Sequence, residues 1–193
     1  IAGNEAQSTK VDEWGANRTN LSDPFYTQFQ GQFINNTAAG NGLSATALAS
    51  YFAIANYNYD NKYFISGNFR RDGNSGFSEA KRWGNFGGGS LGWEVTKEGF
   101  FANSSLSTII SNLRIRGSYG VVGNAAVGAY NYYTTYDPTL YGESGTGFVF
   151  NRAGNVDLGW ETSKQTDVGI NIGFLSNRFS LEVDYFTKNT DGH

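Results

Sequence analysis

The sequence predicts an all-β fold, and more narrowly a segment of an antiparallel transmembrane β-barrel built from about six strands with long extracellular loops. Polar and apolar residues alternate along successive segments between residues 50 and 188, as in strands with two different faces. Every second connection is short and the others are long and rich in Gly, Asn and Tyr, which is typical of membrane barrels. Six strands are too few to enclose a useful interior, so we expect them to belong to a larger barrel.

Composition supports β-structure and excludes several other classes of protein. The 193 residues include 26 Gly, 15 Phe, 12 Tyr and 4 Trp, but 2 Pro and no Cys or Met. Glycine and aromatic residues in these amounts favour strands with many turns. A formal charge of -3 gives no basic surface for nucleic acid, and the lack of cysteine excludes a disulfide framework. The chain begins at Ile1 without a signal peptide, so we expect an internal fragment.

The N-terminal quarter shows little periodicity. Residues 1–49 are polar and contain clusters of Asn, Gly and Ala, so we predict one extracellular loop region there. From about Ser50 the aromatic and small residues alternate with a mixed set, and the turn at 60–62 ends this first strand. The second strand is predicted from Tyr63 to Arg71.

The remaining elements follow the same alternation. A Gly/Ser-rich loop is predicted at 73–82, and a longer connection with a helical turn near 105–110 precedes the clearest strand, 113–119. A long loop is predicted at 120–159 and the start of another at 189–193. The other predicted strands are 82–95, 160–174 and 179–188, the last two joined by a turn at 175–178.

Two observations favour lipid, rather than a soluble core, against the apolar face. Trp83 and Trp93 are ten residues apart on the same face of one predicted strand, and about 9–11 tilted residues cross the hydrocarbon layer. The opposite face carries several charges, which a water-filled lumen tolerates. We therefore expect a set of aromatic residues at the membrane interfaces: Trp83, Trp93, Tyr119, Phe174 and Phe179. Alternation alone also fits a soluble β-sandwich, which stays an alternative.

Several blocks of residues, in order, resemble one family. They are NYNYDNKY at 56–63, FRRDG at 69–73, RWGNF at 82–86, SLGW at 90–93, LRIRGSYG at 113–120, GN at 123–124, LGWETSKQTDVG at 158–169 and VDYF at 183–186. Together these blocks resemble the C-terminal half of the barrel in SusC/RagA-type TonB-dependent outer-membrane transporters of Bacteroidetes. Residues 1–55 carry no part of the resemblance.

The resemblance implies a transporter much larger than this chain. Its barrel would have 22 strands, its N-terminal plug would receive energy from TonB, and a SusD-like surface lipoprotein would cap it in the bacterial outer membrane. The plug and the remaining strands lie outside this sequence. Open sheet edges are costly in lipid because they leave backbone groups unpaired, so we expect these strands to pair with others of the same transporter.

Catalysis is not expected. His193 is the single histidine, so nucleophilic triads based on His or Cys are excluded in practice. Glu182 and Asp184 could act in general acid–base catalysis. They share the polar face of one strand, however, and carboxylates are expected there if that face lines a water-filled lumen. We expect no cofactor and no metal.

The long loop 120–159 has the composition of a binding surface, because exposed tyrosines offer flat faces to sugars, peptides and proteins. Contact with a capping lipoprotein, contact with substrate and ordinary loop packing are all open for these side chains. The candidates are Tyr130, Tyr132, Tyr133, Tyr136 and Tyr141.

Two arginines near the 73–82 loop are further candidates. Arg70 and Arg82, with Arg71 and Asp72, either hold an anionic substrate or pair with neighbouring charges. The predicted function is part of a TonB-dependent importer of large nutrients, either oligosaccharides or peptides, in contact with outer-membrane lipid. A glycan-binding β-sandwich adhesin and a simple porin are the alternatives.

Overall fold

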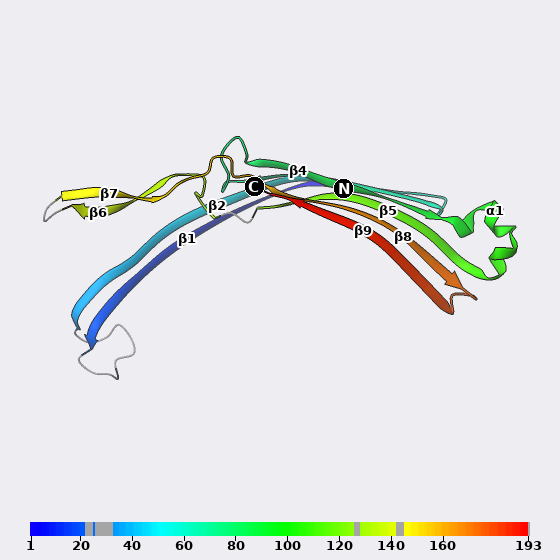
Figure 1. Cartoon of the computed structure of the whole chain (residues 1–193), viewed down its shortest axis with the longest axis horizontal. Helices are drawn as coiled ribbons and strands as arrows, with labels where there is room; N and C mark the ends of the chain where they lie inside the picture. Colours follow the sequence, from blue (N-terminus) through cyan, green and yellow to red (C-terminus); the bar gives the residue numbers. More distant parts are fainter. Residues whose placement is uncertain (22–24, 26–32, 126–127, 142–144, 193) are drawn as a thin grey trace.

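A curved antiparallel sheet dominates the computed structural model, which describes residues 1–21, 25, 33–125, 128–141 and 145–192. Its strand order is β1-β2-β3-β4-β5-β8-β9, and β6 and β7 form a separate two-stranded ribbon. Figure 1 shows the sheet as a single arched layer with the ribbon at one end and the short helices at the other. The bounds are β1 Ala2–Leu21, β2 Phe33–Tyr59, β3 Tyr63–Asn74, β4 Trp83–Glu94, β5 Ile110–Asn124, β6 Thr135–Tyr141, β7 Gly145–Arg152, β8 Glu161–Phe174 and β9 Phe179–Asp191.

Three short helices interrupt the connection between β4 and β5. They are η1 Val95–Lys97, α1 Gly99–Ala102 and η2 Ser105–Thr108. This confirms helical structure in the predicted connection, although it starts earlier than the predicted turn at 105–110. Within the described residues no helix is long and apolar enough to cross a membrane.

The predicted strands from residue 63 onward are confirmed, with somewhat different ends. The strand predicted at 113–119 runs farther in both directions, from Ile110 to Asn124. The tight turn at 60–62 is also confirmed: Asp60 and Asn61 both have positive φ, 51° and 52°. These are the central residues of a turn closed by the hydrogen bond from Lys62 N–H to the carbonyl oxygen of Tyr59, and positive φ at both matches the twist of the flanking strands.

The region 1–49, predicted as one long loop with room for a short strand or helix, contains much more regular structure than expected. Residues 2–21 and much of 33–49 form β1 and the first part of β2, which pair with each other from Ala2↔Ala53 to Leu21↔Phe33. Only residues 48–59 of β2 also pair with β3, so the two strands extend past the rest of the sheet as a ribbon (Figure 1). Small and polar residues fill this ribbon without an apolar repeat, which is why periodicity did not reveal it.

The register places an apolar face and a charged face on opposite sides of the sheet. On the apolar face, one row of paired residues crosses six strands: Tyr59, Tyr63, Trp93, Ile115, Ile170 and Val183. The charged face carries the residues that alternate with these, including Arg70, Arg114, Arg116, Asp167, Glu182 and Asp184. Successive side chains point to opposite faces of a strand, so the two faces are fixed by sequence parity.

Neither face is covered by a second layer of described residues. Ile65, Leu91 and Val168 on the apolar face are 48%, 63% and 52% exposed. Among the described residues, the buried apolar side chains are Phe77, Phe86, Val95 and Phe101, which lie in connections or close to the end of a strand. A β-sandwich would bury one face of the sheet against another sheet, and no such packing exists among the described strands.

Candidate functional site

Two clusters of ion pairs occupy the charged face between β4 and β9. Arg116 on β5 donates from Nη2 to Asp184 Oδ1 at 2.6 Å and also contacts Glu182, both on β9. Arg114 donates from Nε to Glu94 Oε2 at 2.9 Å. Glu94 and Arg114 are directly paired on adjacent strands, whereas Arg116 and Asp184 lie on β5 and β9 and reach each other over Gly169 of the intervening strand β8.

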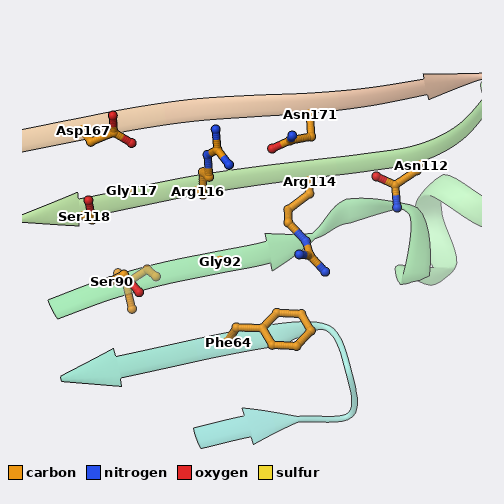
Figure 2. Close-up of a pocket in the computed structure, with 11 residues that line it drawn as sticks. Phe64, Ser90, Gly92, Asn112, Arg114, Arg116, Gly117, Ser118, Asp167 and Asn171 are labelled. Carbon is orange, nitrogen blue, oxygen red and sulfur yellow. The ribbon is translucent and has the colours of Figure 1, made fainter. Parts of the chain in front are cut away.

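A hollow of about 450 Å³ lies over these arginines. Figure 2 shows Arg116 between β5 and β8, with Asp167 and Asn171 on the β8 side. Arg114 lies over the ring of Phe64, with the guanidinium carbon 4.9 Å from the ring centroid. Arg116 Nε and Asn171 Oδ1 are buried atoms without a hydrogen-bond partner in the described part of the chain.

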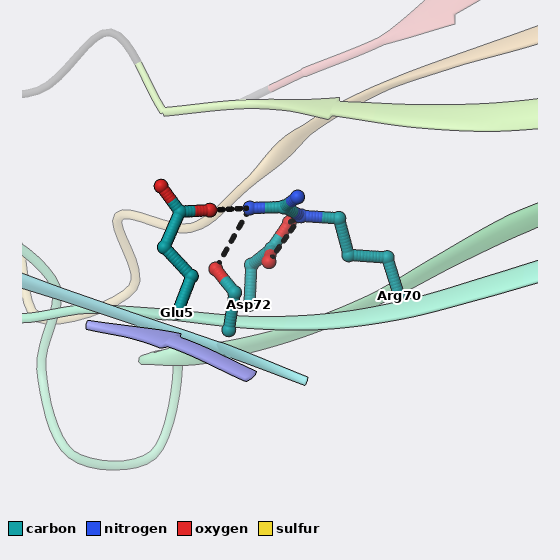
Figure 3. A network of polar contacts seen from close by, with 4 residues as sticks. Glu5, Arg70 and Asp72 are labelled. Carbon is teal, nitrogen blue, oxygen red and sulfur yellow. Dashed lines mark hydrogen bonds and ion pairs between the residues drawn. The ribbon is translucent and has the colours of Figure 1, made fainter. Parts of the chain in front are cut away.

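Arg70 is held in a separate network nearer the end of β3. Its Nε donates to Asp72 Oδ1 at 2.6 Å, and its Nη2 donates to Ser50 Oγ at 2.8 Å. Glu5 on β1 completes the network at 3.4 Å from Nη2, as Figure 3 shows. Of the two earlier alternatives for Arg70, the structure thus contains the pairing with neighbouring charges.

Arg71 and Arg82 are placed differently from Arg70. Arg71 lies on the apolar face, with its guanidinium 5.2 Å from the ring of Trp83, where a cation–π contact is favourable. Arg82 lies just before β4, and its Nε is buried without a partner among the described residues. The four charged residues at this end of the sheet therefore do not form one cluster.

The five candidate tyrosines are not gathered in one site. Tyr132 and Tyr133 pack together at 4.1 Å between ring centroids, and hydrogen bonding to Tyr133 together with burial raises the pKa of Tyr132. Tyr130 precedes them with φ of 61°. Tyr136 lies on β6 and packs against Phe150 of β7 at 6.1 Å. The side chain of Tyr141, at the end of β6, lies outside the described part of the structure.

The β6–β7 ribbon was not predicted, because Pro138 and several glycines give residues 120–159 the composition of an irregular loop. The pairs Tyr136↔Phe150 and Pro138↔Phe148 put these residues on one face. Phe148 and Leu140 are 80% and 79% exposed. The short alternation Gly145–Arg152 was the available signal for this ribbon.

The candidate interface aromatics lie on the apolar face. Trp83 and Trp93 share one face of β4, opposite Gly73 and Tyr63. Phe174 pairs with Phe179 across the β8–β9 turn. Tyr119 is on the same face of β5, where it pairs with Thr166. Tyr51 stacks on Trp83 with 6.2 Å between ring centroids, although the sequence reading did not select it.

The carboxylate of Glu98, in the connection between β4 and β5, accepts hydrogen bonds at the end of the sheet that carries the turn at 60–62. Tyr63 Oη and Trp93 Nε1 both donate to Glu98 Oε1, at 2.5 and 3.2 Å. These hydrogen bonds to the charged form hold the pKa of Glu98 below its ordinary value. Among the described residues, no group of three or more His, Cys, Asp or Glu is placed to bind a metal.

Comparison with known proteins gives one consistent result. A family model described as "TonB dependent receptor-like, beta-barrel" matches residues 2–192. TonB-dependent receptor P39 of Formosa agariphila is 36% identical over 157 residues, which cover 81% of this chain and 15% of the relative. TonB-dependent receptor SusC of Bacteroides thetaiotaomicron is 31% identical over 154 residues, covering 75% of this chain and 15% of the relative.

Solved structures agree with the sequence relatives. The structure of the RagAB peptide transporter superposes with a TM-score of 0.84 at 28% identity, and the match covers 98% of this chain and 21% of that one. The RagAB peptide importer in the "closed-closed" state gives a TM-score of 0.82 at 27% identity, with the same coverage. The chain thus spans about a fifth or less of the proteins that it resembles.

Proposed function

The chain belongs to the β-barrel family of TonB-dependent receptors, with outer-membrane relatives of the SusC/RagA type, and from this we propose that it forms part of the wall of an outer-membrane importer. In this role the apolar face meets lipid and the charged face meets the water-filled interior. The observation that carries the proposal is the uncovered row of apolar side chains across six strands, opposite a face rich in ion pairs.

The height of the apolar face fits a bilayer. On β8, the apolar face runs from Phe174 to the first charged residue on that face, Lys164, ten residues earlier. At about 3.3 Å per residue this is roughly 33 Å of strand, or about 23 Å of height for a strand tilted by about 45°. Barrels have an outward apolar band about 25 Å tall.

We assign the aromatic residues of the apolar face to the two membrane interfaces. Trp93, Phe174 and Phe179 lie beside the short connections, with Tyr63 in the same row as Trp93. Trp83, near the other end of β4, packs between Tyr51 and Arg71, and Tyr119 belongs to the same side. Trp and Tyr are enriched at both membrane–water interfaces, because their amphipathic rings are favourable at the headgroup level.

The connections at the two ends of the strands then face opposite compartments. The turns at 60–62 and 175–178 would lie in the periplasm, because barrels have short periplasmic turns, and the 95–109 connection, at the same end of the strands, would lie there too. The β1–β2 ribbon, the 75–82 loop and the β6–β7 ribbon would extend outside the cell. This places Tyr130, Tyr132, Tyr133, Tyr136 and Tyr141 on the extracellular side.

The complete transporter would import large nutrients, either peptides or oligosaccharides, together with a SusD-like surface lipoprotein. The likeness to a peptide importer named RagAB and to SusC supports this class. TonB would act through a plug that lies outside this chain, and no bond-making step is assigned to these residues. The extracellular tyrosines would meet the lipoprotein or the substrate.

Uptake by cells tests the proposal. Fluorescent peptides and oligosaccharides would be offered to cells that carry the complete transporter, with and without an intact TonB, and to cells that lack the transporter. We expect accumulation that requires both the transporter and TonB. Accumulation that persists without TonB would instead indicate a porin, and no accumulation of either class would overturn the proposed substrates.

A further inference from the structure

Three aromatic rings form a small buried core at the end of the sheet that carries the long loops. They come from different elements: Phe77 from the 75–82 loop, Phe86 from β4 and Trp160 from the residue before β8. Trp160 packs against both other rings, with centroids 5.3 Å from Phe77 and 5.1 Å from Phe86. Phe77 is fully buried and Phe86 is 8% exposed.

Hydrogen bonds reinforce the same junction. Trp160 Nε1 donates to the carbonyl oxygen of Arg82 at 3.1 Å, and this oxygen also accepts from the backbone N–H of Asn74 at 3.1 Å. Ser78 Oγ donates to the carbonyl oxygen of Val156 at 2.8 Å. The 75–82 loop is therefore bonded to the chain that leads into β8 at two points besides the rings.

Two glycines, Gly84 and Gly123, leave the space that the ring of Phe86 occupies. A Cβ at Gly84 or at Gly123 would overlap the Phe86 ring. Gly123 lies on β5, so the ring reaches across from β4 to the neighbouring strand. Any side chain at these positions would force the ring out of its place against Trp160.

The chain before Trp160 connects this core to the candidate tyrosines. Arg152 donates to Asn131 Oδ1 at 2.9 Å and to the carbonyl oxygen of Tyr130 at 3.2 Å. The backbone N–H of Gly154 donates to Thr134 Oγ1 at 3.2 Å. Residues 152–160 thus bridge the buried rings and the segment 128–134, which contains Tyr130, Tyr132 and Tyr133.

We propose that Phe77, Phe86 and Trp160 act as positioning residues, an aromatic latch that fixes segment 128–134 on the wall and makes it move as one body with the 75–82 loop. Without the latch, the residues between β5 and β8 would be tied to the sheet mainly through their two ends. With it, the tyrosines are held in place before any partner arrives, and less ordering has to occur on binding. The latch depends on the proposed function at one point only, namely that the tyrosines contact the lipoprotein or the substrate.

A distance measurement on the complete transporter tests the latch. Spin labels would be attached at Ala80→Cys on the 75–82 loop and at Ala129→Cys in segment 128–134, in a background free of other cysteines. Pulsed electron paramagnetic resonance then gives the distribution of distances between them. We expect one narrow distribution, and a width at least twofold larger in Trp160→Ala.

Gly123→Ala probes the same contact without removing an aromatic ring. The added methyl group should displace Phe86 and broaden the distribution, and Phe86→Leu in the same chain should narrow it again. Phe148→Ala, on the exposed face of the β6–β7 ribbon, is the matched control and should leave the distribution unchanged. Rescue by the second substitution is not expected of general damage to the barrel.

The outcomes separate the latch from the transport proposal because the measurement needs no substrate. A broad distribution in the unsubstituted transporter, or a narrow one in both Trp160→Ala and Gly123→Ala, would overturn the latch. If Trp160→Ala fails to fold, Gly123→Ala and its rescue decide alone. A narrow distribution that broadens as expected supports the latch even where no nutrient is imported.

Discussion

Glu94 and Arg114 form an ion pair across β4 and β5 in which the carboxylate is almost fully buried and the guanidinium is about half exposed. Arg114 Nε lies 2.9 Å from Glu94 Oε2, and the Glu94 side chain is 3% exposed. The other carboxylate oxygen of Glu94 accepts hydrogen bonds from Asn112 Nδ2 at 2.8 Å and Thr96 Oγ1 at 2.9 Å. A buried carboxylate needs several such partners, and here β5 and η1 together provide them.

Replacing this carboxylate should destabilise the barrel. Glu94→Gln removes the charge that faces Arg114, and hydrogen bonds to charged groups contribute about 1.5–3 kcal/mol. We expect a loss near the lower end of that range, because solvent screens the exposed Arg114. Unfolding of the complete transporter in detergent by guanidinium measures it. Glu79→Gln, an exposed residue of the 75–82 loop, is the control, and an equal effect of both changes would contradict this account.

The pH dependence of stability should depend on Glu98. Its folded pKa lies below the ordinary value of 4.5, because Tyr63 and Trp93 donate hydrogen bonds to the carboxylate. The stabilising contribution is therefore complete above pH 4.5 and is lost as the pH falls through the folded value. The difference in stability between the natural chain and Glu98→Gln should be constant from pH 7 to about pH 5 and shrink below that.

A second change identifies the cause of this pH dependence. Tyr63→Phe removes the hydroxyl donor and should shift the acid loss of stability to higher pH, toward 4.5. Acid unfolding curves of the three proteins give the comparison. Curves that coincide for Tyr63→Phe and the natural chain would show that the hydrogen bond has no such effect.

The two carboxylates beside Arg70 should contribute unequally. Asp72 is 16% exposed and lies 2.6 Å from Arg70, whereas Glu5 is 61% exposed and lies at 3.4 Å. Exposed ion pairs contribute about 0–1 kcal/mol, so Glu5→Gln should change the free energy of unfolding by less than about 0.5 kcal/mol. Asp72→Asn should cost clearly more in the same guanidinium titration. The reverse order would mean that the network of Figure 3 is not maintained in the membrane.

The strands with one apolar and one polar face were predictable from sequence, whereas the β1–β2 ribbon and the β6–β7 ribbon were not. Ile170 and Asn171 on β8 illustrate the first case, because one face must be apolar and the other may be polar, which imposes a period of two. In the β1–β2 ribbon, residues such as Ser8, Thr9 and Ala47 belong to strands without a buried face. No face has to be apolar there, so no period appears.

The candidate site was predictable only in part, for a different reason. Arg70, Arg82 and the tyrosines could be selected by residue type, but their grouping depends on the three-dimensional arrangement. Trp160 meets Phe77 across 83 positions of sequence, and no local pattern encodes such a contact. The same applies to the separation of Tyr136 from Tyr132, which follows from the β6–β7 ribbon.

A charge on the apolar face of β8 should be far more harmful than the same charge on the other face. Val168 lies near the middle of the apolar stretch between Phe174 and Lys164, and Gln165 lies on the charged face of the same strand. Val168→Lys should cost about 2–4 kcal/mol if the face contacts the middle of the bilayer. Gln165→Lys should cost little. The comparison uses folding of the complete transporter into lipid vesicles, and similar losses for both would argue against the assigned orientation.

Accessibility along β8 tests the central claim most directly, namely that one face of this sheet lies against lipid and the other against water. Spin labels would be placed singly at residues 164–174 of the complete transporter in lipid vesicles, and collisions with oxygen and with a water-soluble nickel complex would be measured. Oxygen, which concentrates in lipid, should reach labels at 168, 170 and 172, and the nickel complex those at 165, 167 and 171. Equal access of the nickel complex to both sets would contradict the membrane wall.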